Sequence, residues 1–87
     1  MKFEDSYFSR DDRYSLGVES ESGKYYLSIP VSNGVVDYEE YYELTPGEYD
    51  KFLKDATAAA LFAESTRRRE RDRLLIQKPG TNRGTPV

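Results

Sequence analysis

The chain has 87 residues, a formal net charge of −3, no cysteine and no histidine. A chain of this length folds as one small domain, and without cysteine it has no disulfide, no thiolate metal site and no cysteine nucleophile. Because histidine is the commonest general base and the commonest metal ligand, its absence leads us to expect neither an enzyme nor a cofactor.

The first thirteen residues contain three aromatic side chains and are compatible with a short edge strand or with an arm over the core. The stretch from Tyr14 to Glu19 alternates apolar and polar residues, which predicts a strand at about residues 14–20. Glu21-Ser22-Gly23 follows and is typical of a turn.

Two runs rich in β-branched and aromatic residues, at about 24–31 and 35–44, flank Asn33-Gly34. This pattern predicts a β-hairpin, because both turn residues tolerate positive φ. We place Val31 opposite Val36 and Ile29 opposite Tyr38, with a four-residue loop that points Pro30 away from its hairpin partner. A register shifted by one residue would bring acidic side chains onto the apolar face, so we reject it.

The first strand adds its apolar residues to the same face if Val18 lies opposite Leu27. The sequence therefore predicts a three-stranded antiparallel β-meander with one apolar, inner face and one polar, outer face. The residues expected on the inner face are Tyr14, Leu16, Val18, Tyr25, Leu27, Ile29, Val31, Val36, Tyr38, Glu40 and Tyr42.

A lone meander needs a cover, and the sequence after it predicts helices. Thr45-Pro46-Gly47-Glu48 has the pattern of a capping box and predicts a helix at about 46–54. Residues 56–72 are mostly strong helix formers, so we expect a second helix or a continuation past Asp55. The predicted fold class is α+β, a three-stranded antiparallel β-meander covered on one face by one or two C-terminal helices.

The last residues complete the predicted domain organisation. Leu74-Leu75-Ile76 is compatible with a last helical turn or with a short strand at a sheet edge. We expect residues 1–76 to form a single small domain. Residues 77–87 contain two glycines and two prolines, and we expect them to form a flexible tail.

Glu40 is the one acidic residue expected on the inner face. A buried carboxylate must pair, take up a proton or reach the edge of the sheet. We expect it to pair with an arginine of Arg67–Arg73 or to lie at a wet edge, and less readily to anchor a ligand. Consecutive strand residues point to opposite faces and no calcium-binding loop motif is present, so we expect no metal site.

The outer face of the predicted sheet combines acidic side chains with tyrosines. Tyrosine supplies large contact area at low entropic cost, and acidic groups steer the encounter with a basic protein. The same pattern is also compatible with an ordinary solvated sheet face. The candidate protein-binding residues are Glu19, Tyr26, Asp37, Glu39, Tyr41 and Glu43.

The charge is unevenly distributed along the chain. Residues 1–65 carry 6 basic and 14 acidic side chains, whereas residues 66–87 carry 7 basic and 2 acidic side chains. The arginines of the second part could bind phosphates, or they could belong to a solvated helix end beside an acidic body. The candidate nucleic-acid-binding residues are Arg67, Arg68, Arg69, Arg71 and Arg73.

These features favour a small protein-interaction module whose partner is a protein with a basic surface. An inhibitor or immunity-type protein is the sharper form of this hypothesis, and a nucleic-acid-associated accessory protein is the alternative. The cluster of small residues at Ala58–Ala60 and Ala63 would also allow packing against a second copy of the chain, and hence a homodimer. The N-terminus does not resemble a signal peptide and no apolar run reaches the roughly 20 residues of a membrane span, so we expect a cytoplasmic protein without membrane contact.

Overall fold

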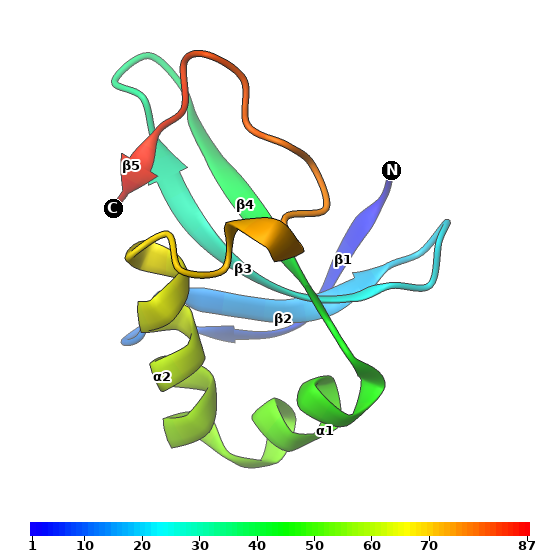
Figure 1. Cartoon of the computed structure of the whole chain (residues 1–87). Helices are drawn as coiled ribbons and strands as arrows, with labels where there is room; N and C mark the ends of the chain where they lie inside the picture. The colour runs from blue at the N-terminus through cyan, green and yellow to red at the C-terminus, as the bar shows by residue number, and fades with distance from the viewer.

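The computed structural model describes all 87 residues, as an antiparallel sheet with two helices against one of its faces (Figure 1). Four strands form a meander in chain order: β1 (Phe3–Ser9), β2 (Tyr14–Glu19), β3 (Tyr25–Ser32) and β4 (Asp37–Leu44). A two-residue strand, β5 (Thr85–Pro86), pairs with β3. The predicted α+β class is confirmed, and the meander gains one strand because the N-terminal segment is an edge strand.

The inner face of the sheet carries the hydrophobic core, as the alternation of apolar residues predicts. Leu16, Leu27 and Ile29 are completely buried, and two helical phenylalanines, Phe52 and Phe62, close the core from the other side. The core comprises Tyr14, Leu16, Leu27, Ile29, Val31, Tyr42, Leu44, Phe52, Ala59, Phe62, Ala63 and Leu75. Two of the four alanines in the small-residue cluster are therefore used to bring the second helix close to the sheet.

The predicted register of the central hairpin is wrong by two residues. Val31 pairs with Tyr38 and Ile29 pairs with Glu40, whereas the predicted partners were Val36 and Tyr38. The loop spans residues 33–36, and the Asn33 side chain closes it by accepting hydrogen bonds from the amides of residues 35 and 36 at 3.0 and 2.8 Å. A shift of two residues keeps every side chain that remains within a strand on its predicted face. It leaves Val36 in the exposed loop instead of on the inner face.

The pairing of β2 with β3 is displaced in the same way. Leu16 pairs with Leu27, where the sequence analysis placed Val18. Pro30 behaves as expected, because its carbonyl oxygen accepts from the amide of Val87 at 3.2 Å and so points away from β4. Since the N–H and C=O of one strand residue point to the same side, the missing donor of proline costs no bond to β4.

The two helices begin where their capping residues predict. Helix α1 (Pro46–Lys54) starts at Thr45, which forms a complete capping box with Glu48. Helix α2 (Ala56–Arg67) starts at Asp55, whose carboxylate accepts from the amide of Ala58 at 3.1 Å. Asp55 therefore separates two helices. None of the helices has both the length and the apolar character that a membrane span requires.

Helix α2 ends five residues before the predicted residue 72. Arg69 adopts a left-handed conformation with φ of 60°, and its amide bonds back to the carbonyl of Thr66 at 3.0 Å. The amide of Glu70 bonds to the carbonyl of Ser65 at 3.0 Å, which completes a Schellman motif. The strong helix formers after this point are overridden, because Leu75 must return to the core.

After α2 the chain runs back along the sheet through the 3-10 helix η1 (Asp72–Leu74). Leu75 bridges to Tyr42, and the amide of Ile76 bonds to the carbonyl of Tyr41 at 2.9 Å, so these residues follow the free edge of β4. Residues 77–82 then form the loop that arches beyond the sheet in Figure 1 and leads to β5.

Residues 83–87 differ from the predicted flexible tail, because they are attached to the sheet. The amide of Gly84 donates to the Tyr38 hydroxyl at 2.7 Å, and the next two residues pair with Val31 and Ser32. A Cβ atom on Gly84 would lie 2.7 Å from the carbonyl carbon of Ser32. Only glycine permits the chain to approach β3 so closely.

Candidate functional site on the outer face of the sheet

The outer face of the sheet carries an aromatic cluster instead of separate exposed tyrosines. Phe3 of β1 stacks on Tyr41 with ring centroids 3.6 Å apart, and its edge meets Tyr26 at 5.5 Å. Tyr26 and Tyr41 meet edge to face at 4.9 Å. This arrangement leaves Tyr26 with 0% of its surface exposed, so the expectation that Tyr26 is an exposed contact residue is wrong.

Glu19, the second enclosed member of the predicted set, organises the turn between β2 and β3. Its carboxylate accepts from the backbone amides of Lys2, Glu21 and Ser22 at 2.7 to 3.0 Å, and the residue is 1% exposed. These hydrogen bonds, above all that from Lys2, lower the pKa of Glu19 to about 2. Glu19 therefore stabilises the fold, and it is not available to a partner.

This environment of Glu19 predicts an acid-dependent loss of stability. The carboxyl has a pKa of about 4.3 in an unfolded chain and of about 2 in the folded one, so its contribution is complete above pH 5 and lost as the pH falls to 2. Replacing Glu19 by glutamine should lower the thermal midpoint at pH 6, and the gap to the wild type should narrow steadily toward pH 2. Thermal unfolding followed by circular dichroism measures both curves. Parallel curves across this range would contradict the assignment.

The other four predicted residues remain accessible on the outer face. Asp37 and Glu43 are exposed, and Glu43 lies 3.8 Å from Lys24 in a surface ion pair. Glu39 and Tyr41 are half-buried. The structure therefore keeps three acidic groups along one face of β4, with the aromatic cluster between two of them.

A hollow of about 460 Å³ lies on this face beside Glu39. Its floor is made by Ser15 of β2 and Pro30 of β3, and Asp5 and Phe8 of β1 stand at its side. Small side chains on the floor and larger ones around it give the concave shape. The turn between β1 and β2 contributes two arginines to the lining, Arg10 and Arg13.

A β-bulge in β1 places Phe8 at the hollow. Asp5 pairs with Gly17 and Tyr7 pairs with Leu16, so Ser6 is the extra residue. A bulge reverses the alternation of side chains beyond it. Phe8 consequently points to the outer face, where it is 59% exposed, while Tyr7 lies on the side of the core near Tyr14.

The two acidic groups of the hollow are held by hydroxyl groups. Glu39 accepts from Ser28 Oγ at 2.9 Å, and Asp5 accepts from the Tyr26 hydroxyl at 2.6 Å. Burial raises the pKa of Glu39 and the charge of Asp5 raises it further, whereas the Ser28 hydrogen bond and the charge of Arg13 lower it. Burial and the bond to Asp5 also raise the pKa of Tyr26 far above its usual value, so its hydroxyl stays protonated and donates.

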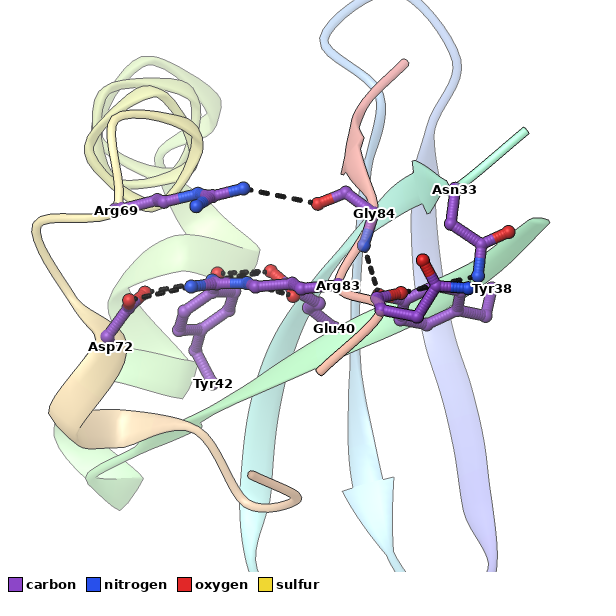
Figure 2. Close-up of polar contacts among 9 residues, drawn as sticks. Asn33, Tyr38, Glu40, Tyr42, Arg69, Asp72, Arg83 and Gly84 are labelled. Carbon is purple, nitrogen blue, oxygen red and sulfur yellow. Dashed lines mark hydrogen bonds and ion pairs between the residues drawn. The ribbon is translucent and has the colours of Figure 1, made fainter. Parts of the chain in front are cut away.

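Glu40 on the inner face pairs with an arginine, but not with one of Arg67–Arg73. Figure 2 shows Arg83 between two carboxylates, with Nε and Nη2 donating to Glu40 at 2.7 and 3.0 Å. The same guanidinium donates to both oxygens of Asp72 at 2.8 and 3.0 Å, and the Tyr42 hydroxyl donates to Glu40 at 2.9 Å. Every polar group of this cluster has a partner, so it acts as a structural clamp on the C-terminal segment.

Most arginines of the predicted nucleic-acid-binding set have partners within the chain. Arg67 donates to the carbonyls of residues 12 and 13 at 2.6 and 2.7 Å, and Arg71 lies over the Phe62 ring at 5.2 Å. Arg68 bonds to Glu70, Arg69 bonds to the carbonyl of Gly84 at 3.3 Å, and Arg73 is exposed in η1. Because α2 ends at Arg67, these side chains do not share one helical face.

Sequence reasoning missed Asp5, Phe8 and Ser15 as members of the site. The bulge at Ser6 has no sequence signature, so the orientation of Phe8 could not be read from alternation. One usable signal was the set of small residues at outer-face positions of β2 and β3, namely Ser15, Gly17 and Ser28. Small residues in the middle of a sheet face predict a depression there.

No group of three or more acidic side chains is placed where it could hold a metal ion. No protein-family model, curated protein or solved structure matches this chain.

Proposed function

We propose that this chain is a protein-interaction module that binds a basic protein surface with the outer face of its sheet, in the manner of an inhibitor or immunity-type protein. The observation that carries the proposal is the row of accessible acids on β4 beside a hollow of about 460 Å³, whose lining holds two carboxylates together with Arg10 and Arg13. Concave shape and unpaired charge on one face are what an interface needs for specificity and for fast encounter.

The distribution of the basic residues supports the same conclusion. Arg83 is clamped between Glu40 and Asp72, and Arg67 is bound to the turn between β1 and β2. This use of two C-terminal arginines within the fold involves neither Asp37 nor Glu43. It leaves the acids of β4 on the outer face without a full set of counter-charges from within the chain.

The size of the molecule is sufficient for a specific complex. It measures 34 × 28 × 21 Å along its principal axes, so a broad face can supply the ~800 Å² per partner of a standard interface. A complex formed mainly through exposed charges should weaken as salt is added, because screening reduces their attraction.

The test compares two variants with the same change in charge. The outer-face variant combines Asp37→Asn, Glu39→Gln and Glu43→Gln. The control variant combines Asp50→Asn, Glu64→Gln and Glu70→Gln, which lie on the two helices and the following turn and are exposed. Partners are captured on the immobilised wild-type protein, identified by mass spectrometry and titrated against all three proteins.

We expect the outer-face variant to bind the captured partner at least about tenfold more weakly, since three charged contacts of modest strength are lost. The control variant should bind as the wild type does. Equal binding by the outer-face variant, or loss of binding only in the control variant, would overturn the proposal. Thermal unfolding of both variants confirms that they are folded.

A further inference from the structure

The floor of the hollow contains a hydroxyl group without a hydrogen-bond partner in the chain. Ser15 is 4% exposed, lines the hollow and pairs across the sheet with Ser28. The Ser28 hydroxyl bonds to Glu39, whereas Ser15 Oγ forms none of the side-chain hydrogen bonds of the chain. Because this unpaired oxygen opens into the hollow, it marks a position where a bound group can form a hydrogen bond with it.

The two carboxylates of the hollow have capacity for a donor-rich ligand. Asp5 and Glu39 each accept one hydroxyl hydrogen bond from within the chain. An ionised carboxylate accepts about four hydrogen bonds. Several acceptor positions are therefore open on each carboxylate. Glu39 is half-buried, and at such a position the attraction between its charge and that of a bound cation is stronger than at a fully solvated surface.

Apolar surface stands beside these acceptors. The Phe8 ring lines the hollow and is 59% exposed, and Pro30 forms part of the floor. A planar cation gains from stacking on an aromatic ring while its edges donate to carboxylates. Among protein side chains only arginine combines a flat apolar face with five donors in one plane.

We infer that the hollow receives one arginine side chain of the basic partner, with the guanidinium stacked on the Phe8 ring and donating to Asp5, to Glu39 and to the hydroxyl oxygen of Ser15. This inference rests on the proposed function and names the group that the outer face recognises. The open shape of the hollow suits a side chain that projects from a protein better than a free small molecule, whose surface would stay largely exposed.

The two arginines in the lining determine how a change in their charge should alter the binding of a ligand. Arg13 donates to the carbonyl of Val87 at 2.8 Å, and no side-chain hydrogen bond holds Arg10. Both lie close enough to repel a second guanidinium. Removing the charge of Arg10 should therefore strengthen binding of a cation, whereas it would weaken binding of an anion.

The test uses N-acetyl-arginine amide as the probe and follows the folded protein by nuclear magnetic resonance. Saturable shifts should appear at residues 5, 8, 15 and 39 at millimolar concentrations. The neutral isostere N-acetyl-citrulline amide should cause no saturable shift, and neither should the anionic N-acetyl-glutamate amide. The double variant Asp5→Asn with Glu39→Gln should bind the arginine probe at least about tenfold more weakly, since hydrogen bonds to charged groups are lost. Arg10→Gln should bind it more tightly.

Equal response to the citrulline probe, no saturable response to the arginine probe, or weaker binding in Arg10→Gln would each overturn the inference. Failure here is distinguishable from failure of the proposed function. If the arginine probe does not bind while partner capture still depends on the three acids of β4, the face binds its partner without inserting an arginine. If partner capture is independent of those acids, the proposed function fails whatever the probe does.

Discussion

Replacing Arg83 by methionine is expected to lower the free energy of unfolding by about 3 kcal/mol, the lower end of the cost of leaving one charge of a buried pair alone. Glu40, whose side chain is 7% exposed, would then lose both donors of its bidentate partner and keep only the Tyr42 hydroxyl. The lower end applies because Arg83 is itself 14% exposed and the Asp72 side chain already faces solvent in part. Urea denaturation followed by circular dichroism measures the loss.

A matched substitution provides the control. Arg68→Met removes an arginine that is also paired, to Glu70 at 2.9 Å, but this pair is exposed on both sides. Exposed pairs contribute little, so the urea midpoint of this variant should not move measurably. Equal effects of the two substitutions would show that the buried position of Arg83 has no energetic consequence.

A double variant separates the clamp from the buried charge. In Glu40→Met with Arg83→Met no carboxylate is left at the buried end of this pair, so this double variant should be more stable than Arg83→Met alone. Amide exchange should nevertheless remain fast at Gly84 and β5, because the segment has lost its anchor. Restored protection of β5 in the double variant would contradict the role of Arg83 as a clamp.

The face assignment of the meander was predictable, and the exact pairing of its strands was not. Alternation decides whether Ile29 points inward, and a register shift of two residues leaves that decision unchanged. The choice between the two registers depends on the Asn33 side chain, which closes a four-residue loop, and on Glu40, which finds its partner 43 residues further along the chain. Neither contact leaves a periodic pattern in the sequence.

The C-terminal segment shows the same limit. Its composition predicts a chain without fixed structure, since it has almost no apolar residue to bury. It is held instead by single-residue contacts: Arg83 in the acidic clamp, Gly84 against β3 and the amide of Val87 on Pro30. The composition of a segment does not reveal contacts made by single residues. Arg83 anchors the segment only because the fold brings Glu40 and Asp72 together around it.

The candidate site was predictable in its general location only. Acidic residues at alternate positions of β4 marked the outer face, and Asp37, Glu39 and Glu43 are indeed accessible there. Tyr26 was expected to be exposed because its contacts with the side chains of Phe3 and Asp5 on β1 were not known. Contacts from the side chains of one strand cannot be inferred from the alternation of residues in another strand.

The contact between β1 and Tyr26 depends on Gly17 of β2, which lies against both. Replacing Gly17 by alanine is expected to destabilise the protein by about 3 kcal/mol, as overpacking of a tightly packed position does. A Cβ atom on Gly17 would lie 2.6 Å from Tyr26 Cζ and would also collide with the Tyr26 hydroxyl and the carbonyl oxygen of Glu4. One neighbour is backbone and the other is a ring packed on Phe3, so neither can move aside alone. The thermal midpoint should fall by at least roughly 10 °C for a domain of this size.

The matched control is Gly47→Ala in the first turn of α1, where the nearest atom to an added Cβ is Thr45 Oγ1 at 4.0 Å. This substitution restricts the unfolded chain without a clash, so it should leave stability unchanged or raise it by about 0.5 kcal/mol. In Gly17→Ala the amides of β1 should also lose protection against exchange before those of β3, because the clash separates β1 from β2 first. Since the hollow includes Asp5 and Phe8 of β1, the same variant should bind the arginine probe poorly at temperatures where β3 and β4 are still folded. Undiminished protection of β1, together with unchanged stability, would mean that the outer face is not assembled around Gly17.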